Sequence, residues 1–426
     1  MKWLAAPCPL IGIITALLVL CQTAHAENWP HWRGPSGNGV ASQGNPPTRW
    51  TDSENVKWKV AIPGSSSGSP VVWDDRVFVV SAIPVAKTAP SPGLPRLKFD
   101  VFCFSRDTGK ALWQRTAIEA TPHEETHSTN GFASASPCTD GEHVYASFGS
   151  QGLYCYTMDG ELVWSRNDFG TMQIRNGFGE GSSPTIAGDM ILLPWDHQGQ
   201  SYLYALDKRT GKTVWQTPRD EPTQWSTPLV VTHNGRQQVI MNGENKARAY
   251  DLETGKELWS CGGQTQRPVA SAVSDGKLVF VTSGFRGEFL GAFTMDGTGD
   301  IEGTRDVVWT TERDTPDIAS PLLSGGRLYF HKGKSGLLTC LDAATGKPHF
   351  TASRVDGING TYASPVAAGG HIYITDREGT VTVIEDATTL KVVAKNKMNE
   401  PVDASPAIAD DQIFVRGANH LFCIGA

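Results

Sequence analysis

Seven residues of this sequence carry side chains suited to ligand binding or proton transfer: Arg175, Glu180, Asp196, His197, Trp225, Arg286 and His331. Carboxylates and imidazoles move protons or hold cations, and guanidinium groups bind anions. An indole offers a large apolar face with one polar edge. The set therefore suits the wall of a polar binding cavity, although solvated charged loops explain the same pattern.

Known catalytic motifs do not account for these residues. The glycine-rich stretch 177–181 lacks the preceding strand, the following helix and the lysine of a phosphate loop. Asp296, Asp300 and Glu302 miss the EF-hand spacing, and a hairpin extension explains them better. The histidines and cysteines form no closely spaced ligand pair, and no Gly-x-Ser-x-Gly elbow occurs. The sequence thus predicts no metal site and assigns no catalytic residue.

The elements that position these side chains are repeated. A Ser/Thr-Pro dipeptide followed by apolar residues recurs at a spacing of roughly 44 residues, the mark of a repeat architecture. The copies begin at Ser69, Ser136, Ser183, Thr227, Ser320, Ser364 and Ser405, and Ser271 begins a degenerate eighth copy.

Each repeat predicts four short strands. A tight-turn pair such as Asn234-Gly235 follows the first strand, and an alternating run such as Arg327–Phe330 follows the turn. A third strand then leads through Asp-x-x-Thr-Gly-Lys into a fourth strand ending on Trp, as in 207–215. Four strands per repeat without a helical period indicate a β-propeller blade.

The chain ends indicate how the ring closes. The last repeat offers only three strands (405–424), while Asn55–Val60 is an isolated strand containing Trp58. This strand would complete the last blade and remove an exposed sheet edge. The sequence therefore predicts an all-β, eight-bladed β-propeller, and a seven-bladed ring with a stray hairpin is the alternative.

One face of this propeller should carry the variable loops. The turns between strands one and two, and between strands three and four, are short and similar in every repeat. The connections between blades and the loops after second strands differ, and binding concentrates in such loops. They comprise residues 121–133, 170–181, 195–197, 218–225, 284–286, 310–318, 331–332 and 353–362.

The cysteines and the net charge argue against a disulfide-stabilised fold and against a nucleic-acid-binding protein. Cys103, Cys155, Cys340 and Cys423 occupy one register of the third strand, which predicts separate small core residues rather than disulfides. The net charge is −7, and no basic run occurs, so nucleic-acid binding is not expected.

The first 26 residues have the features of a signal peptide: Lys2, an apolar run from Leu10 to Leu20, and Ala24-His25-Ala26 before Glu27. An uncleaved anchor helix and a lipid on Cys21 are the alternatives. We expect residues 1–26 to be a signal peptide, 27–54 an N-terminal extension and 55–426 the propeller. The mature protein would be periplasmic or secreted, with no transmembrane segment, and monomeric.

The repeat resembles a known family. The Ser-Pro opening of each blade and the Leu-Asp-x-x-Thr-Gly-Lys-x-x-Trp ending, clearest at 206–215 and 341–347, are similar to the pyrroloquinoline-quinone (PQQ)-like β-propeller repeat. The likeness covers roughly residues 50–426. The segment Asn28–Pro35 also resembles the start of exported propellers of planctomycete-type bacteria.

The resemblance implies two different functions. Propellers similar to the outer-membrane-assembly lipoprotein are scaffolds without a cofactor, whereas quinoprotein dehydrogenases use PQQ with calcium, and commonly a disulfide of adjacent cysteines that this sequence lacks. We expect a non-catalytic scaffold that binds an envelope protein or polymer and needs no cofactor. The alternatives are a PQQ- and calcium-dependent dehydrogenase of alcohols or sugars, and a carbohydrate-binding propeller using Trp195, Trp225 and Tyr362.

Overall fold

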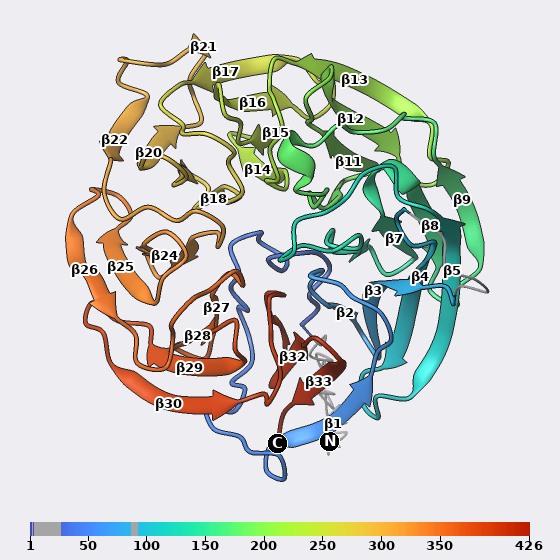
Figure 1. Cartoon of the computed structure of the whole chain (residues 1–426). Helices are drawn as coiled ribbons and strands as arrows, with labels where there is room; N and C mark the ends of the chain where they lie inside the picture. The colour runs from blue at the N-terminus through green and yellow to red at the C-terminus, as the bar shows by residue number, and fades with distance from the viewer. Residues whose placement is uncertain (2, 4–26, 87–92) are drawn as a thin grey trace.

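The computed structural model describes Met1, Trp3 and residues 27–86 and 93–426. The predicted signal peptide, apart from Met1 and Trp3, therefore lies outside the described residues. The described chain forms eight separate sheets arranged around one axis, and each has four antiparallel strands (Figure 1). The prediction of an all-β, eight-bladed propeller is confirmed, and the seven-bladed alternative is wrong.

The first four blades follow the repeat order, each from its inner to its outer strand. Two short 3-10 helices, η1 (Gly149–Gln151) and η2 (Arg175–Gly177), lie in the loops of this half. The strands are β2 (Val71–Trp73), β3 (Arg76–Pro84), β4 (Leu97–Ser105), β5 (Ala111–Ala120); β6 (Cys138–Thr139), β7 (His143–Ser147), β8 (Leu153–Thr157), β9 (Leu162–Arg166); β10 (Thr185–Ala187), β11 (Met190–Trp195), β12 (Ser201–Asp207), β13 (Thr213–Arg219); β14 (Leu229–His233), β15 (Arg236–Met241), β16 (Ala247–Asp251) and β17 (Glu257–Cys261).

The other four blades complete the ring. Their strands are β18 (Val273–Ser274), β19 (Leu278–Ser283), β20 (Phe289–Thr294), β22 (Val307–Thr311); β23 (Leu322–Ser324), β24 (Arg327–His331), β25 (Leu337–Asp342), β26 (Pro348–Arg354); β27 (Val366–Ala368), β28 (His371–Thr375), β29 (Thr380–Glu385), β30 (Val392–Lys397); β31 (Ala407–Ala409), β32 (Gln412–Arg416), β33 (His420–Ile424) and β1 (Val56–Ala61). β1 pairs antiparallel with β33, so the N-terminal strand closes the last blade as expected.

The repeated tryptophan joins neighbouring blades. Its indole N–H donates to a backbone oxygen of the next blade, as from Trp164 to Lys208 at 3.0 Å. The ring lies against the glycine of the next Thr-Gly turn, and a Cβ on Gly211 would lie 2.7 Å from Trp164. Packing of this kind requires glycine. The same pairing occurs at Trp58–Gly109, Trp113–Gly160, Trp215–Gly255 and Trp309–Gly346. These tryptophans lie near the start of the fourth strand, so the expectation that the strand ends on Trp is wrong.

The repeated Ser/Thr-Pro dipeptide forms a belt around the axis. Except for Ser69 Oγ, which has no partner among the described residues, each hydroxyl accepts a hydrogen bond from the backbone N–H of the corresponding residue one blade earlier, as from Ser136 N–H to Ser183 Oγ at 2.9 Å. Seven such bonds of 2.8–3.1 Å link Ser69 to Ser405. Because the hydroxyl oxygen is the acceptor, its own O–H stays available as a donor.

The segment 27–54 crosses the axis and binds the inner strands of distant blades (Figure 1). Trp29 exchanges two backbone hydrogen bonds of 2.9 Å with Val72 of β2, and its side chain is fully buried. Arg33 is buried and donates to Pro365 O at 2.7 Å and Pro321 O at 2.6 Å. These two carbonyls belong to different blades, so the segment ties the ring across its centre.

The cysteines within the described residues are free and buried, as the register argument predicts. Cys103 of β4, for example, lies opposite Phe78 and Trp113 on the neighbouring strands. Within the same residues, no helix is long and apolar enough to cross a membrane. The stretch with Asp296, Asp300 and Glu302 is a hairpin extension between β20 and β22, as expected, and in it β21 (Gly299–Asp300) pairs parallel with β17.

Candidate functional site

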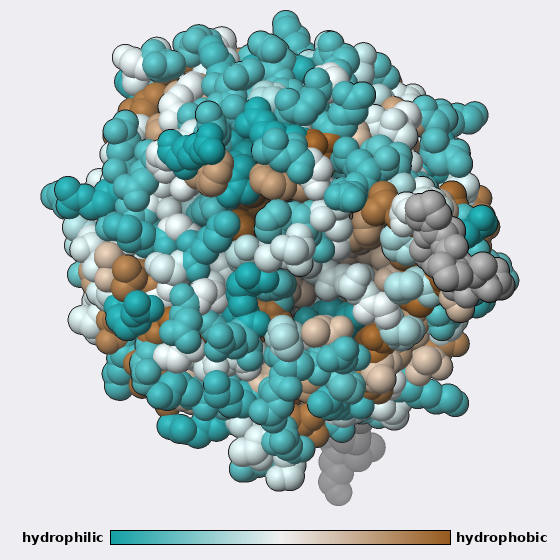
Figure 2. All heavy atoms as spheres, viewed as in Figure 1, coloured by the Kyte–Doolittle hydropathy of each residue, from teal (hydrophilic) through white to brown (hydrophobic). Residues whose placement is uncertain are grey.

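The main candidate site is a central chamber of about 400 Å³ at the loop end of the channel, a size typical of small-ligand pockets. Trp32 of the N-terminal segment is part of its lining. The connection 121–133 reaches across the chamber, because Thr129 Oγ1 lies 3.3 Å from the hydroxyl of Tyr362, which follows β26. The outer view in Figure 2 is mostly hydrophilic, with apolar residues in small separate groups.

One wall of the chamber is cationic. Arg267 and Lys334 come from different blades, and both bind Asp317 Oδ2, at 3.1 and 3.2 Å. The Arg267 guanidinium also stacks on the Phe285 ring, 3.6 Å from its centroid. Its Nε–H is buried and has no hydrogen-bond partner. Two cations thus share one carboxylate, which leaves this wall with a net positive charge.

A second ion pair lies farther around the chamber and is neutral. Arg377 donates to both carboxylate oxygens of Asp403, at 2.7 and 2.9 Å. The same guanidinium lies 3.8 Å from the centroid of the Tyr362 ring. The hydrogen bonds to Asp403 hold the pKa of Arg377 above its ordinary value, so the guanidinium stays charged at neutral pH. Asp403 therefore has no oxygen without a cationic partner.

Hydroxyl groups and aromatic rings complete the lining. Five members of the belt face the chamber: Ser136, Ser183, Thr227, Ser364 and Ser405. The aromatic rings come from Trp32, His127, Phe178, Trp225, Phe285 and Tyr362. The Trp225 indole donates to Gly179 O at 2.7 Å, which fixes the ring beside the chamber. Together these groups suit a ligand with both hydroxyl groups and apolar faces.

Glu180 lies in a smaller side pocket of about 50 Å³ that also contacts Trp225. Its carboxylate accepts from the Ser150 N–H at 2.7 Å and from the Ser150 hydroxyl at 2.5 Å. Burial raises the pKa of Glu180 to about 7, and the Ser150 hydrogen bonds offset only part of this rise. A carboxyl that titrates near neutral pH marks a candidate functional group.

Two of the predicted site residues have structural partners. Asp196 and Arg219 form an ion pair with fully buried side chains, with Nε 2.9 Å from Oδ1. Burial opposes the charge on Arg219, but Asp196 outweighs it and raises the pKa of Arg219. His197 Nδ1 accepts from the backbone N–H of Gln173 in the connection 170–181 at 3.1 Å, and His197 Nε2 donates to Gln200 O in its own loop at 3.2 Å. Burial lowers the pKa of His197.

The other predicted residues lie at different places. Arg175 binds Glu244 at 2.7 Å, and Arg286 is exposed with a positive φ of 54°. His331 is buried, which lowers its pKa to about 4. Trp225 alone among the seven lines the central chamber, and it also lines the side pocket with Glu180 and Asp196.

Sequence reasoning missed the cationic wall. Arg267, Asp317 and Lys334 stand singly in three different loops, and no motif joins them. The one usable signal was position: each lies in a blade connection or in a loop after a second strand, where variable binding residues concentrate.

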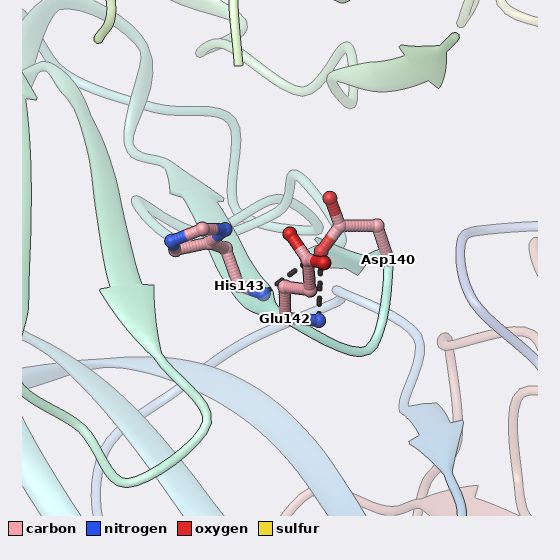
Figure 3. Close-up of side chains that lie close together, drawn as sticks. All are labelled: Asp140, Glu142 and His143. Carbon is pink, nitrogen blue, oxygen red and sulfur yellow. Dashed lines mark hydrogen bonds between the residues drawn. The ribbon is translucent and has the colours of Figure 1, made fainter. Parts of the chain in front are cut away.

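Among the described residues, the one convergent set of three metal-ligating side chains lies elsewhere, at the turn between β6 and β7 (Figure 3). Asp140 Oδ1 accepts from the backbone N–H of Glu142 at 3.0 Å and of His143 at 2.8 Å. Lys208 Nζ lies 3.0 Å from Asp140 Oδ2. Both oxygens thus serve the turn and an ion pair between blades, so this cluster is accounted for structurally.

Comparison with known proteins identifies the family. Residues 98–352 match the model of the PQQ-repeat family described as outer membrane protein assembly factor BamB, and the chain belongs to this family. BamB of Yersinia pestis is 22% identical over 323 residues, 73% of this chain and 75% of that protein. The quinoprotein ethanol dehydrogenase of Pseudomonas putida is 23% identical over 364 residues, 72% of this chain and 52% of that enzyme. The polyvinylalcohol dehydrogenase of a Pseudomonas species is 23% identical over 282 residues, 55% of this chain and 40% of that enzyme.

Solved structures agree on the fold. BamB from Moraxella catarrhalis superposes with a TM-score of 0.58 at 14% identity, covering 87% of this chain and 99% of that chain. A europium-containing methanol dehydrogenase superposes with a TM-score of 0.65 at 12% identity, covering 92% of this chain and 90% of that chain. At such identities the likeness concerns the fold alone, since one fold serves many functions.

Proposed function

We propose that this protein is an exported, non-catalytic binding scaffold of the cell envelope, which needs no cofactor and holds a protein or polymer at its loop face. One observation carries the proposal: the carboxylates beside the central chamber, Asp317 and Asp403, are each already bound to cationic side chains. Asp317 binds Arg267 and Lys334, and Asp403 binds Arg377. A general acid or base needs a proton site free to exchange, which such pairs do not offer.

The family supports a partner in the envelope. The BamB relative is named for outer membrane assembly, and this chain aligns with 75% of its length. The loop connections supply the contact surface, since they differ from blade to blade while the strands beneath them are alike. We expect the mature protein to be a periplasmic or secreted monomer beginning near Glu27.

Site-specific cross-linking tests this proposal. A photoreactive amino acid at Ser128, exposed in the connection across the chamber, should yield a discrete adduct with an envelope component. The matched control is Asp107, exposed in the β4–β5 turn on the opposite face, which should yield no such adduct. Equal labelling from both positions, or no adduct from Ser128 in the living cell, would contradict binding at the loop face.

A PQQ- and calcium-dependent dehydrogenase is the second candidate. Two relatives are named as dehydrogenases, and Glu180 has a pKa of about 7 beside the chamber. The residues present do not fit the calcium–quinone group, however. The single carboxylate in the chamber lining, Asp403, is bound through both oxygens to Arg377. A calcium ion takes several oxygen ligands, and this carboxylate has no oxygen free to act as one.

Fluorescence titration separates the two candidates. PQQ is added to the mature protein with and without calcium, and tryptophan emission is followed, because Trp32 and Trp225 line the chamber. The scaffold proposal expects no saturable, calcium-dependent quenching. Saturable quenching that requires calcium would overturn it in favour of the dehydrogenase.

A further inference from the structure

We propose that the central chamber binds the terminal residue of an acidic saccharide chain, with the sugar carboxylate held by Arg267 and Lys334. This inference rests on the proposed binding function and names the ligand class for its chamber. It follows from three observations: the charge of one wall, the hydroxyl belt and aromatic lining, and the closure of the channel beneath.

The charge of the wall selects an anion. Arg267 and Lys334 approach the same oxygen of Asp317, so their cationic nitrogens lie side by side with a single carboxylate between them. The Nε–H of Arg267 is buried without an acceptor, which is costly unless a ligand or water supplies one. Lys334 keeps a partly exposed side chain, 42% accessible, and can turn toward a ligand. A carboxylate would complete the pairing of this wall.

The rest of the lining selects a sugar. Each belt hydroxyl that accepts a backbone N–H still has an O–H to donate, so the chamber presents several donors around one ligand. A saccharide offers a matching number of oxygen acceptors. The faces of its rings carry C–H groups, which pack against aromatic side chains such as Trp225 and Tyr362.

The closed base selects a chain end. Trp32 lies in the chamber lining, and its indole reaches Ser405 Oγ at 3.4 Å. Behind it, Arg33 is anchored to the carbonyls of Pro321 and Pro365. A polymer entering from the loop face therefore meets a closed base and cannot thread through. The chamber volume of about 400 Å³ accommodates an end and excludes a long internal stretch.

Calorimetry on the purified mature protein tests the inference with defined probes. The probes are D-galacturonic acid, its tetramer and its polymer, with D-galactose as the neutral comparison. Saturable binding of galacturonate is expected, at least tenfold tighter than binding of galactose. One protein should bind per polymer chain whatever the chain length, because only one kind of end fits.

Two matched lysine variants test whether the cationic wall of the chamber binds the sugar carboxylate. Lys334→Met should weaken galacturonate binding at least tenfold and leave galactose binding unchanged, since the ion pair of Arg267 with Asp317 remains. Lys110→Met removes an exposed lysine from the β4–β5 turn and should change neither. Thermal unfolding of each variant checks that the fold is intact.

Each remaining outcome overturns the inference. Equal affinity for galactose and galacturonate would show that the cationic wall does not recognise the carboxylate. If the number of protein molecules bound per polymer chain rises with chain length, internal residues bind as well and the chamber does not select a chain end. If no sugar binds but Ser128 still cross-links to an envelope partner, the inference fails and the scaffold proposal stands. Calcium-dependent PQQ binding without any binding of galacturonate would overturn both.

Discussion

The two faces of this propeller are built from the same strands and differ in almost everything else. On the turn face, the same tryptophan–glycine contact joins one blade to the next at five interfaces. On the loop face, each connection has its own contacts, and charged residues are buried in pairs such as Asp196–Arg219. Repetition thus maintains the ring, while irregular sequence builds the chamber.

The difference has a physical basis. A repeated turn satisfies its own polar groups locally, as where Asp207 Oδ1 accepts from Thr210 N–H at 2.8 Å and from its hydroxyl at 2.7 Å. A long connection must bury backbone and side-chain polar groups against other loops, and each buried polar group needs a partner. Substituting one charged side chain of the loop face therefore leaves its buried partner unpaired, which is more costly than the same change in a turn.

The largest effect is expected at the buried ion pair of the loop face. Asp196→Ala should lower the free energy of unfolding by about 3–5 kcal/mol, because it leaves the Arg219 charge buried and unpaired. Urea denaturation measures the change. The double variant Asp196→Leu/Arg219→Met should recover most of the loss, since no charge is left alone.

A different result would change the role of Asp196. If Asp196→Ala unfolds at the wild-type urea concentration and instead loses ligand or partner binding, the residue belongs to the function rather than to the scaffold of the loop face.

A smaller effect is expected at the repeated contact of the turn face. Gly211→Ala adds a Cβ 2.7 Å from Trp164 at a φ of +70°, whereas Gly235→Ala adds one in open space at a φ of +76°. In both variants the free energy of unfolding should fall by about 1 kcal/mol, because alanine is strained in the left-handed backbone conformation. In Gly211→Ala it should fall by a further ~1–3 kcal/mol, because the Cβ clashes with Trp164.

Thermal and urea unfolding of the two variants give this difference directly. Equal losses would mean that the tryptophan moves aside without cost, and the contact would then not hold the blades together.

The last effect is a pH dependence that arises from Glu180. Because burial raises its pKa from 4.5 to about 7, the folded protein binds a proton there that the unfolded chain has released. This contribution to stability is fully present below pH 4.5 and is lost as the pH rises through about 7. Glu180→Gln should remove this part of the slope.

Urea midpoints measured from pH 4.5 to 8 for wild type and Glu180→Gln provide the comparison. Parallel curves would show that Glu180 has an ordinary pKa, and the case for a proton-transferring group beside the chamber would disappear.

The sequence was informative where residues repeat and weak where they do not. Ser183, Gly211 and Trp164 occur in register with their counterparts, so one repeat predicts the others and the blade count follows. Of the seven predicted site residues, the structure places Trp225 at the central chamber, and Glu180 and Asp196 with it at the side pocket. Arg267 and Lys334 carry no local pattern, because their meeting point is Asp317, in a third loop.

By itself, the sequence determined the architecture: four strands per repeat, eight repeats, and closure by Asn55–Val60, because strand period and turn chemistry are local properties of the chain. Tertiary structure alone decided which loops meet. In the folded chain, the connection 121–133 contacts Tyr362, and Arg33 binds carbonyls of two blades. Arg267 and Lys334 also bind one carboxylate, that of Asp317. These contacts join residues far apart in the chain, and no local preference of the sequence encodes them.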